Sequence, residues 1–170
     1  MLRAADIRTL ADVRLAPGSR RHPHFGASAL DASLGEIGIA YVHLPTLGGR
    51  REPRADSPHR ALRVAAFRGY ADYMETAEFA RGYERLVSLA RESRTAFMCA
   101  ETLWWRCHRR LIADRLTADG WTVTHLLAPG GGAPDGAGAP GKSEPHVLWD
   151  TARIDNGDLV YDAGTLPLPT

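Results

Sequence analysis

Both cysteines of the chain lie within eleven residues, close to a histidine and two arginines. A cysteine reacts as its thiolate, which neighbouring cations and the N-terminus of a helix stabilise. Arg106 and Arg109 supply the cations, and His108 can act as a general base. The spacing therefore predicts a reactive-thiol site with Cys99 as the catalytic or redox thiol and Cys107 beside it. The alternative is that both cysteines are small buried apolar residues.

The same residue types also suit a metal ion. Cys99, Cys107 and His108 offer ligand atoms that zinc accepts, but their spacing matches none of the compact zinc-finger patterns. The chain has no glycine-rich phosphate loop, no Gly-x-Ser-x-Gly elbow and no His-Glu-x-x-His helix. The sequence therefore predicts neither a cofactor nor a resident metal, and metal binding stays an alternative.

The reactive stretch is expected at a turn from a strand to a helix. Residues 95–98 form a short apolar run that is typical of a buried strand, and residues 110–119 show a helical pattern that ends at Gly120. The first turn of such a helix has unpaired N–H groups and the positive end of the helix dipole. A thiolate, a phosphate or a carboxylate would be stabilised there.

The rest of the chain predicts an α/β fold in which strands and helices alternate. Strands are expected at residues 10–14, 39–44 and 121–127, and helices around residues 29–37 and, with Thr76 as a cap between two helices, at 61–91. This alternation indicates one domain, residues 1–170, with a mostly parallel sheet and crossover helices. Asn156-Gly157 predicts a C-terminal β-hairpin. Residues 128–143 read as a flexible insertion rich in Gly, Ala and Pro.

The predicted topology brings three chemically useful side chains together. Ligands bind at the carboxyl ends of the strands in a parallel sheet. The first three strands end at Arg14, His43 and Cys99, so we expect all three residues at one edge of the sheet.

Composition bounds the function. Of the 170 residues, 44% are apolar and 24% are charged, which is ordinary for a globular protein, and the net charge is +1. No run approaches the ~20 apolar residues of a membrane span, and the N-terminus lacks the apolar core of a signal peptide. We therefore expect a cytoplasmic protein with free thiols and no membrane partner.

Taken in order, these segments resemble the domain-of-unknown-function 488 family. The residues that carry the resemblance share their order along nearly the whole chain: Leu10-Ala11-Asp12-Val13-Arg14 with Pro17 and Ser19, Phe25, Gly38-Ile39-Ala40-Tyr41, Leu47-Gly48-Gly49, Phe67, Tyr70, Tyr73-Met74, Cys99-Ala100-Glu101, Cys107-His108-Arg109, Val123-Thr124-His125 and residues 146–161. The resemblance implies catalytic roles for Cys99, Glu101 and His108, and anion binding by Arg14, Ser19, Cys107 and Arg109. We also expect anion binding by His43, from its place at the strand ends, and by Arg106, from its charge beside the thiols. It implies no reaction, because the family is named for lacking one.

Three functions fit these patterns. The first is a thiol-dependent transferase or hydrolase that transfers sulfur or acts on a small anionic, nucleotide-like substrate. A fainter resemblance to rhodanese-like domains rests on the Asp-Val-Arg strand and a cysteine at a strand-to-helix turn. The second is a nucleic-acid-binding or DNA-repair-associated protein, whose phosphate-binding and base-stacking residues would be Arg14, Arg20, Arg21, Arg50, Arg51, Arg54, Trp104 and Trp105. The third is a domain that recognises a protein partner through the loop at residues 45–58.

Overall fold

A parallel sheet forms the centre of the computed structural model, which describes residues 1–18, 21–127 and 143–162. The sheet contains β1 (Thr9–Asp12), β2 (Ala40–His43) and β3 (Thr95–Met98), in the order β2-β1-β3. Each strand lies close to the range that its apolar run predicts. The predicted α/β fold with a parallel sheet is confirmed.

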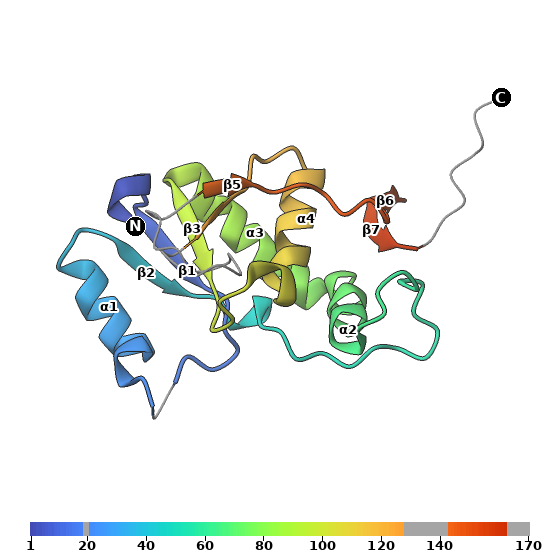
Figure 1. Ribbon diagram of the computed structural model, residues 1–170, viewed down its shortest axis with the longest axis horizontal. Helices are drawn as coiled ribbons and strands as arrows, with labels where there is room; N and C mark the ends of the chain where they lie inside the picture. Colours follow the sequence, from blue (N-terminus) through green and yellow to red (C-terminus); the bar gives the residue numbers. More distant parts are fainter. Residues whose placement is uncertain (19–20, 128–142, 163–170) are drawn as a thin grey trace, which may run out of the picture.

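Helices lie on both faces of this sheet (Figure 1). The helix α1 (Ala27–Gly35) connects β1 to β2 and covers one face. On the opposite face lie α3 (Ala77–Glu92) and α4 (Arg109–Ala118), and α2 (Ala65–Met74) packs against these two helices. Thr76 separates α2 from α3, and its hydroxyl oxygen accepts the backbone N–H of Phe79 at 3.2 Å, which confirms the predicted cap.

The two faces of the sheet have separate cores because side chains alternate along a strand. Leu10 of β1 packs with Leu30 and Leu34 of α1. Ala11 and Val13 point the other way, into the larger core that the helices α2, α3 and α4 complete. The same alternation assigns the residues just after each strand to one face or the other, which decides what they can reach.

The C-terminal part forms two small antiparallel sheets beside α4. The strand β4 (Thr124–Leu126) pairs with β5 (Ser143–Pro145), and β6 (Ala152–Asp155) pairs with β7 (Asp158–Tyr161). The predicted hairpin is confirmed. The strand predicted at residues 121–127 is shorter, since only three residues pair, and it joins β5 rather than the parallel sheet. Of the predicted insertion, residues 128–142 lie outside the described residues and Ser143 begins β5.

Within the described ranges, four short 3-10 helices lie in the connections. They are η1 (Arg3–Ala5), η2 (Pro23–Phe25), η3 (Pro45–Leu47) and η4 (Trp104–Arg106). Two of them lie near the site: η3 follows β2, and η4 leads into α4. Over the described ranges, every helix is too short or too polar to cross a membrane.

Candidate active site

The two cysteines meet where β3 gives way to α4. Cys99 is the first residue after β3, and Cys107 lies between η4 and His108, the residue that precedes α4. The two sulfur atoms and one ring nitrogen of His108 all lie within 4.8 Å of one another. Cys107 is buried at 4% exposure, whereas Cys99 is only partly buried. Both thiols are free, and Cys99 is the one that solvent reaches.

A backbone carbonyl fixes how His108 presents its ring. Its Nε2 lies 3.3 Å from the carbonyl oxygen of Val13, and its Nδ1 lies 3.6 Å from Cys107 Sγ. A carbonyl oxygen can only accept a hydrogen bond, so Nε2 carries the hydrogen in the neutral ring. The lone pair of Nδ1 therefore faces the sulfur atoms, which is the arrangement of a base beside a thiol.

The ring of His108 is enclosed by its neighbours. A Cβ atom at Gly49 would lie 2.7 Å from Nδ1, so only glycine allows the backbone to come this close. The ring of Tyr70 lies against the imidazole with 4.9 Å between centroids, and its hydroxyl donates to the carbonyl of Leu47 at 2.7 Å. The loop after β2 and the helix α2 thus hold the imidazole in place.

The two thiols differ in how readily they lose a proton. A hydrogen bond from the Cys107 thiol lowers the pKa of Cys99, against the opposing effect of burial, and so do the protonated form of the His108 ring, which then donates through Nδ1, and the backbone N–H of Glu101. The Cys99 thiolate and burial together raise the pKa of Cys107. The two groups titrate as a pair, and the first proton leaves the more accessible sulfur. Cys99 is the thiolate of the pair.

Two of the predicted polar residues hold the loop around the thiols. Arg109 Nε donates to Cys107 Sγ at 3.4 Å, and another nitrogen of its guanidinium donates to the carbonyl of Glu101. The Glu101 carboxylate accepts the N–H of Leu103 at 3.1 Å. Arg106 is exposed. Arg109 therefore contacts a thiol directly, whereas the Glu101 carboxylate braces the turn.

Arg14 and His43 belong to a separate network at the same sheet edge. Arg14 Nε donates to both carboxylate oxygens of the buried Asp12, at 2.8 and 3.0 Å, and Tyr41 donates to Asp12 at 2.6 Å. His43 Nε2 lies 2.9 Å from the carbonyl of Arg14. Burial raises the pKa of Asp12, but the hydrogen bonds from Arg14 and Tyr41 outweigh it and lower that pKa overall. The Asp12 carboxylate therefore takes up Arg14 N–H groups that could otherwise bind an anion.

Strand alternation separates this network from the thiols. Asp12 pairs with His43 and Met98 across the sheet, so these residues share the face that α1 covers. Cys99 packs in the core on the opposite face, together with Val13. The three strand ends therefore meet at one edge but point to different sides. Ser19 lies outside the described residues.

Asp12 is not among the predicted site residues, although the pattern at the end of β1 carries a signal for it. Residues two apart in a strand point to the same face, so the Asp-x-Arg pattern at the end of β1 favours an ion pair. The contacts of Gly49 and of the Val13 carbonyl with His108 join segments distant in sequence, and no local pattern predicts them.

The sequence also did not predict a buried network of hydrogen bonds between side chains. His125 Nε2 lies 2.9 Å from His146 Nδ1, and His146 Nε2 lies 2.9 Å from Asp114 of α4. Tyr161 donates to the same carboxylate at 2.9 Å. Trp104 stacks on His125 with 3.7 Å between ring centroids. Trp104 is thus packed against protein.

Several arginines proposed for nucleic-acid contact are also engaged within the protein. Arg51 lies over the ring of Tyr73 at 3.7 Å, and Arg54 pairs with Glu75 at 2.6 Å. Arg14 is held by Asp12, as described above. Arg20 lies outside the described residues. These contacts weigh against a continuous phosphate-binding surface made by this set.

Comparisons with known proteins agree with the ordered resemblance of the sequence. The model of the family described as Domain of unknown function DUF488 matches residues 1–116, which include the three parallel strands and the whole thiol cluster. No curated protein and no solved structure matches the chain significantly. Because the matched range is well over half of the chain, this protein belongs to the DUF488 family.

Proposed function

We propose that the protein is a cysteine-dependent transferase in which Cys99 is the nucleophile. The observation that carries the proposal is the cluster of two thiols and a ring nitrogen of His108, with all three atoms within 4.8 Å of one another. Cys107 donates to the Cys99 sulfur and keeps its own proton, and Arg109 adds a positive charge beside the pair. A thiolate held in this way is a good nucleophile near neutral pH.

Sulfur transfer is the reaction that uses these parts without a further cofactor. The Cys99 thiolate attacks the outer sulfur of a thiosulfonate donor, the S–S bond of the donor breaks, and the sulfinate or sulfite leaves with the electron pair. Cys99 then carries a persulfide. An acceptor thiolate attacks the outer sulfur of that persulfide and restores the Cys99 thiolate. His108 Nδ1 takes the proton of the incoming acceptor thiol.

The charges around the cluster favour an anionic donor. Arg106 is exposed, and Arg109 lies against Cys107 at the start of α4, where the helix dipole also attracts negative charge. The rhodanese-like analogy points the same way. We place the reaction in the reducing cytoplasm, where both thiols remain free for catalysis.

Thiosulfate as donor and cyanide as acceptor test the proposal on the full-length protein. We expect turnover by the wild type, loss of turnover in Cys99→Ala, and weaker turnover in Cys107→Ala. Mass spectrometry of the protein after thiosulfate alone should show one added sulfur atom on the peptide that contains Cys99. Equal turnover by the three proteins, or a sulfur adduct on Cys107 alone, would refute the assignment.

The same cluster favours a second function, the binding of a zinc ion. Zinc-bound histidines usually donate their other ring N–H to a carboxylate or a backbone carbonyl, and His108 Nε2 has that partner in Val13. Cys99, Cys107 and His108 would be three ligands, and a water or substrate would complete the set. Metal analysis of protein purified without chelators decides this: stoichiometric zinc that is lost in Cys99→Ala supports it, and zinc below stoichiometry after zinc addition contradicts it.

A further inference from the structure

A cavity of about 420 Å³ lies on the other side of α2 from the thiols, and arginines dominate its wall. Its lining residues are Pro53, Arg54, Ala55, Ser57, Arg60 and Arg68. Among the described residues, no acidic side chain lines the cavity. Arg68 and Tyr70 are separated by about 200° around the helix, so the cavity and the ring that packs on His108 are on opposite faces of α2. The cavity is therefore distinct from the candidate active site.

Close packing onto α2 fixes the loop that forms the cavity wall. A Cβ atom at Gly69 would lie 2.3 Å from the carbonyl oxygen of Arg51, so the loop backbone contacts the helix at a position that only glycine allows. The backbone N–H of Arg54 donates to the Asp72 carboxylate at 2.8 Å. The loop is thus held in place without any ligand, which reduces the entropy that the binding of a ligand would cost.

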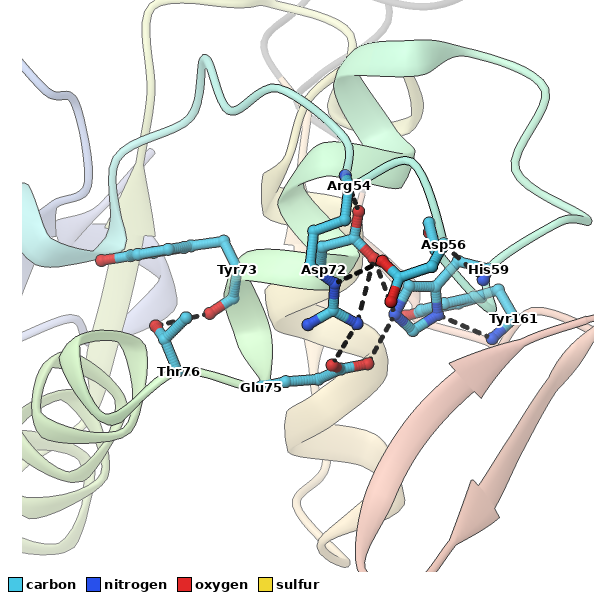
Figure 2. A network of polar contacts seen from close by, with 9 residues as sticks. Arg54, Asp56, His59, Asp72, Tyr73, Glu75, Thr76 and Tyr161 are labelled. Carbon is cyan, nitrogen blue, oxygen red and sulfur yellow. Dashed lines mark hydrogen bonds and ion pairs between the residues drawn. The ribbon is translucent and has the colours of Figure 1, made fainter.

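A polar network on the face of α2 that borders the cavity anchors the C-terminal end of the loop, around His59 (Figure 2). His59 Nε2 lies 3.0 Å from Glu75 and 3.8 Å from Asp72, and His59 Nδ1 accepts the backbone N–H of Tyr161 at 3.2 Å. The Tyr161 carbonyl in turn accepts the N–H of Ala61 at 3.1 Å. The loop is fastened to both α2 and β7.

This network is built as an anchor rather than as a metal centre. His59, Asp72 and Glu75 do place ligand-type atoms within 4.8 Å of one another. However, a backbone N–H can only donate, so His59 Nδ1 is the acceptor and Nε2 carries the hydrogen. That hydrogen faces the two carboxylates, in the position that a cation would have to occupy. In addition, the Arg54 guanidinium already pairs with Glu75 at 2.6 Å.

The charges left on the cavity wall belong to two arginines. The Arg54 guanidinium pairs with Glu75 at 2.6 Å and also lies 3.6 Å from Asp72 and 3.8 Å from Asp56, so its charge is already compensated. Arg68 uses one nitrogen, Nη1, to donate to the Leu62 carbonyl at 3.1 Å, which holds the side chain and leaves its other donors. The exposed Arg60 guanidinium has no ion-pair partner in the part of the chain that the structure describes. The buried Ser57 hydroxyl accepts from the N–H of His59 at 3.4 Å and keeps its own hydrogen to donate.

We propose that this cavity binds the phosphate group of a small phosphomonoester. Two guanidinium groups match the two negative charges of a phosphate monoester, and guanidinium groups bind phosphate oxygens in pairs. The Ser57 hydroxyl supplies one more donor. A cavity of about 420 Å³ is larger than a phosphate ion and lies within the range of small-molecule sites, so it accommodates part of the attached group as well.

Isothermal titration calorimetry of the full-length protein tests the proposal with ribose 5-phosphate as the probe and ribose as its uncharged counterpart. We expect ribose 5-phosphate to bind and ribose not to bind. Arg60→Gln should weaken binding about tenfold, and the double change Arg60→Gln and Arg68→Gln should weaken it further. Arg85→Gln removes a charge from an exposed position on α3 and should leave binding unchanged.

Three results would overturn the assignment. They are the absence of binding at roughly 10 mM ribose 5-phosphate, wild-type binding by Arg60→Gln, and equal weakening by Arg60→Gln and Arg85→Gln. Because the Arg60 side chain makes no ion pair within the described ranges, its replacement should not unfold the protein, and thermal denaturation verifies this. Octathymidylate with a 5′-hydroxyl carries only phosphodiesters. If it binds as tightly as ribose 5-phosphate and depends equally on Arg60, the assignment to a monoester is wrong.

Discussion

Two histidines show how a single backbone group decides what a side chain can do. His108 donates through Nε2 to the Val13 carbonyl, so its lone pair faces the two sulfur atoms. His59 accepts the Tyr161 N–H through Nδ1, so its hydrogen faces two carboxylates. The first ring can take a proton from a thiol or bind a metal, and the second fastens a loop. The residue type alone predicts neither role.

This orientation gives a prediction for the thiol pair. In His108→Gln, the alkylation of Cys99 by iodoacetamide should need a higher pH than in the wild type, because the bond and charge of the imidazole that lower the pKa of Cys99 are lost. The pH dependence of alkylation, followed by peptide mass spectrometry, measures this. His43→Gln is the matched control, since His43 lies on the opposite face of the sheet. An equal change in both variants would contradict the prediction.

The chain predicts its elements well where local pattern decides them. The three parallel strands, the cap between α2 and α3, and the C-terminal hairpin follow from apolar runs, a threonine and an Asn-Gly turn. The pairing of β4 with β5 does not follow, because residues 127–142 separate the two strands and no periodicity links them. The alternation of side chains along each strand also decides the faces to which Arg14 and Cys99 point. It predicts that they differ only when the register between the strands is known.

The cap between α2 and α3 gives a prediction at the scale of elements. Thr76→Ala should lower the free energy of unfolding by about 1 kcal/mol, because the N–H of Phe79 loses its acceptor at the start of α3. Urea denaturation followed by circular dichroism measures the change. Thr76→Ser keeps the hydroxyl oxygen and should retain most of the stability. A Thr76→Ser protein as unstable as Thr76→Ala would show that the methyl group, not the cap, matters.

At the scale of the whole molecule, one carboxylate joins the family core to the C-terminal segment. Asp114 of α4 lies inside the matched range 1–116, and it accepts hydrogen bonds from His146, Trp149 and Tyr161, which lie beyond it. Asp114 is fully buried. Removing its partners would leave a buried charge without compensation, which is costly. The C-terminal segment is therefore part of what makes α4 stable.

This region also predicts how stability depends on pH. Burial, then the nearby His146 and arginines, lowers the pKa of His125 to about 4, below its ordinary value of 6.5. Between these values the unfolded chain binds the proton and the folded protein does not, so stability should fall as the pH drops from 6.5 to 4. The loss attributable to His125 is at most roughly 3 kcal/mol.

Urea denaturation at a series of pH values measures the effect. The loss of stability between pH 6.5 and pH 4 should be smaller in His125→Gln than in the wild type. Burial also lowers the pKa of His59, but that contribution is present in both proteins and cancels in the comparison. Parallel curves for the two proteins would show that His125 is not the titrating group.

The backbone of Val13 has a consequence for spectroscopy. Its N–H donates to the Met98 carbonyl at 3.0 Å, and its own carbonyl accepts from His108. This single buried residue thus bridges the end of β3 and the imidazole beside the thiols. Its carbonyl carbon should change its chemical shift when Cys99 is alkylated, and its amide should exchange slowly with deuterium. One isotope-labelled residue would therefore act as an internal probe of the site, readable before any substrate is known.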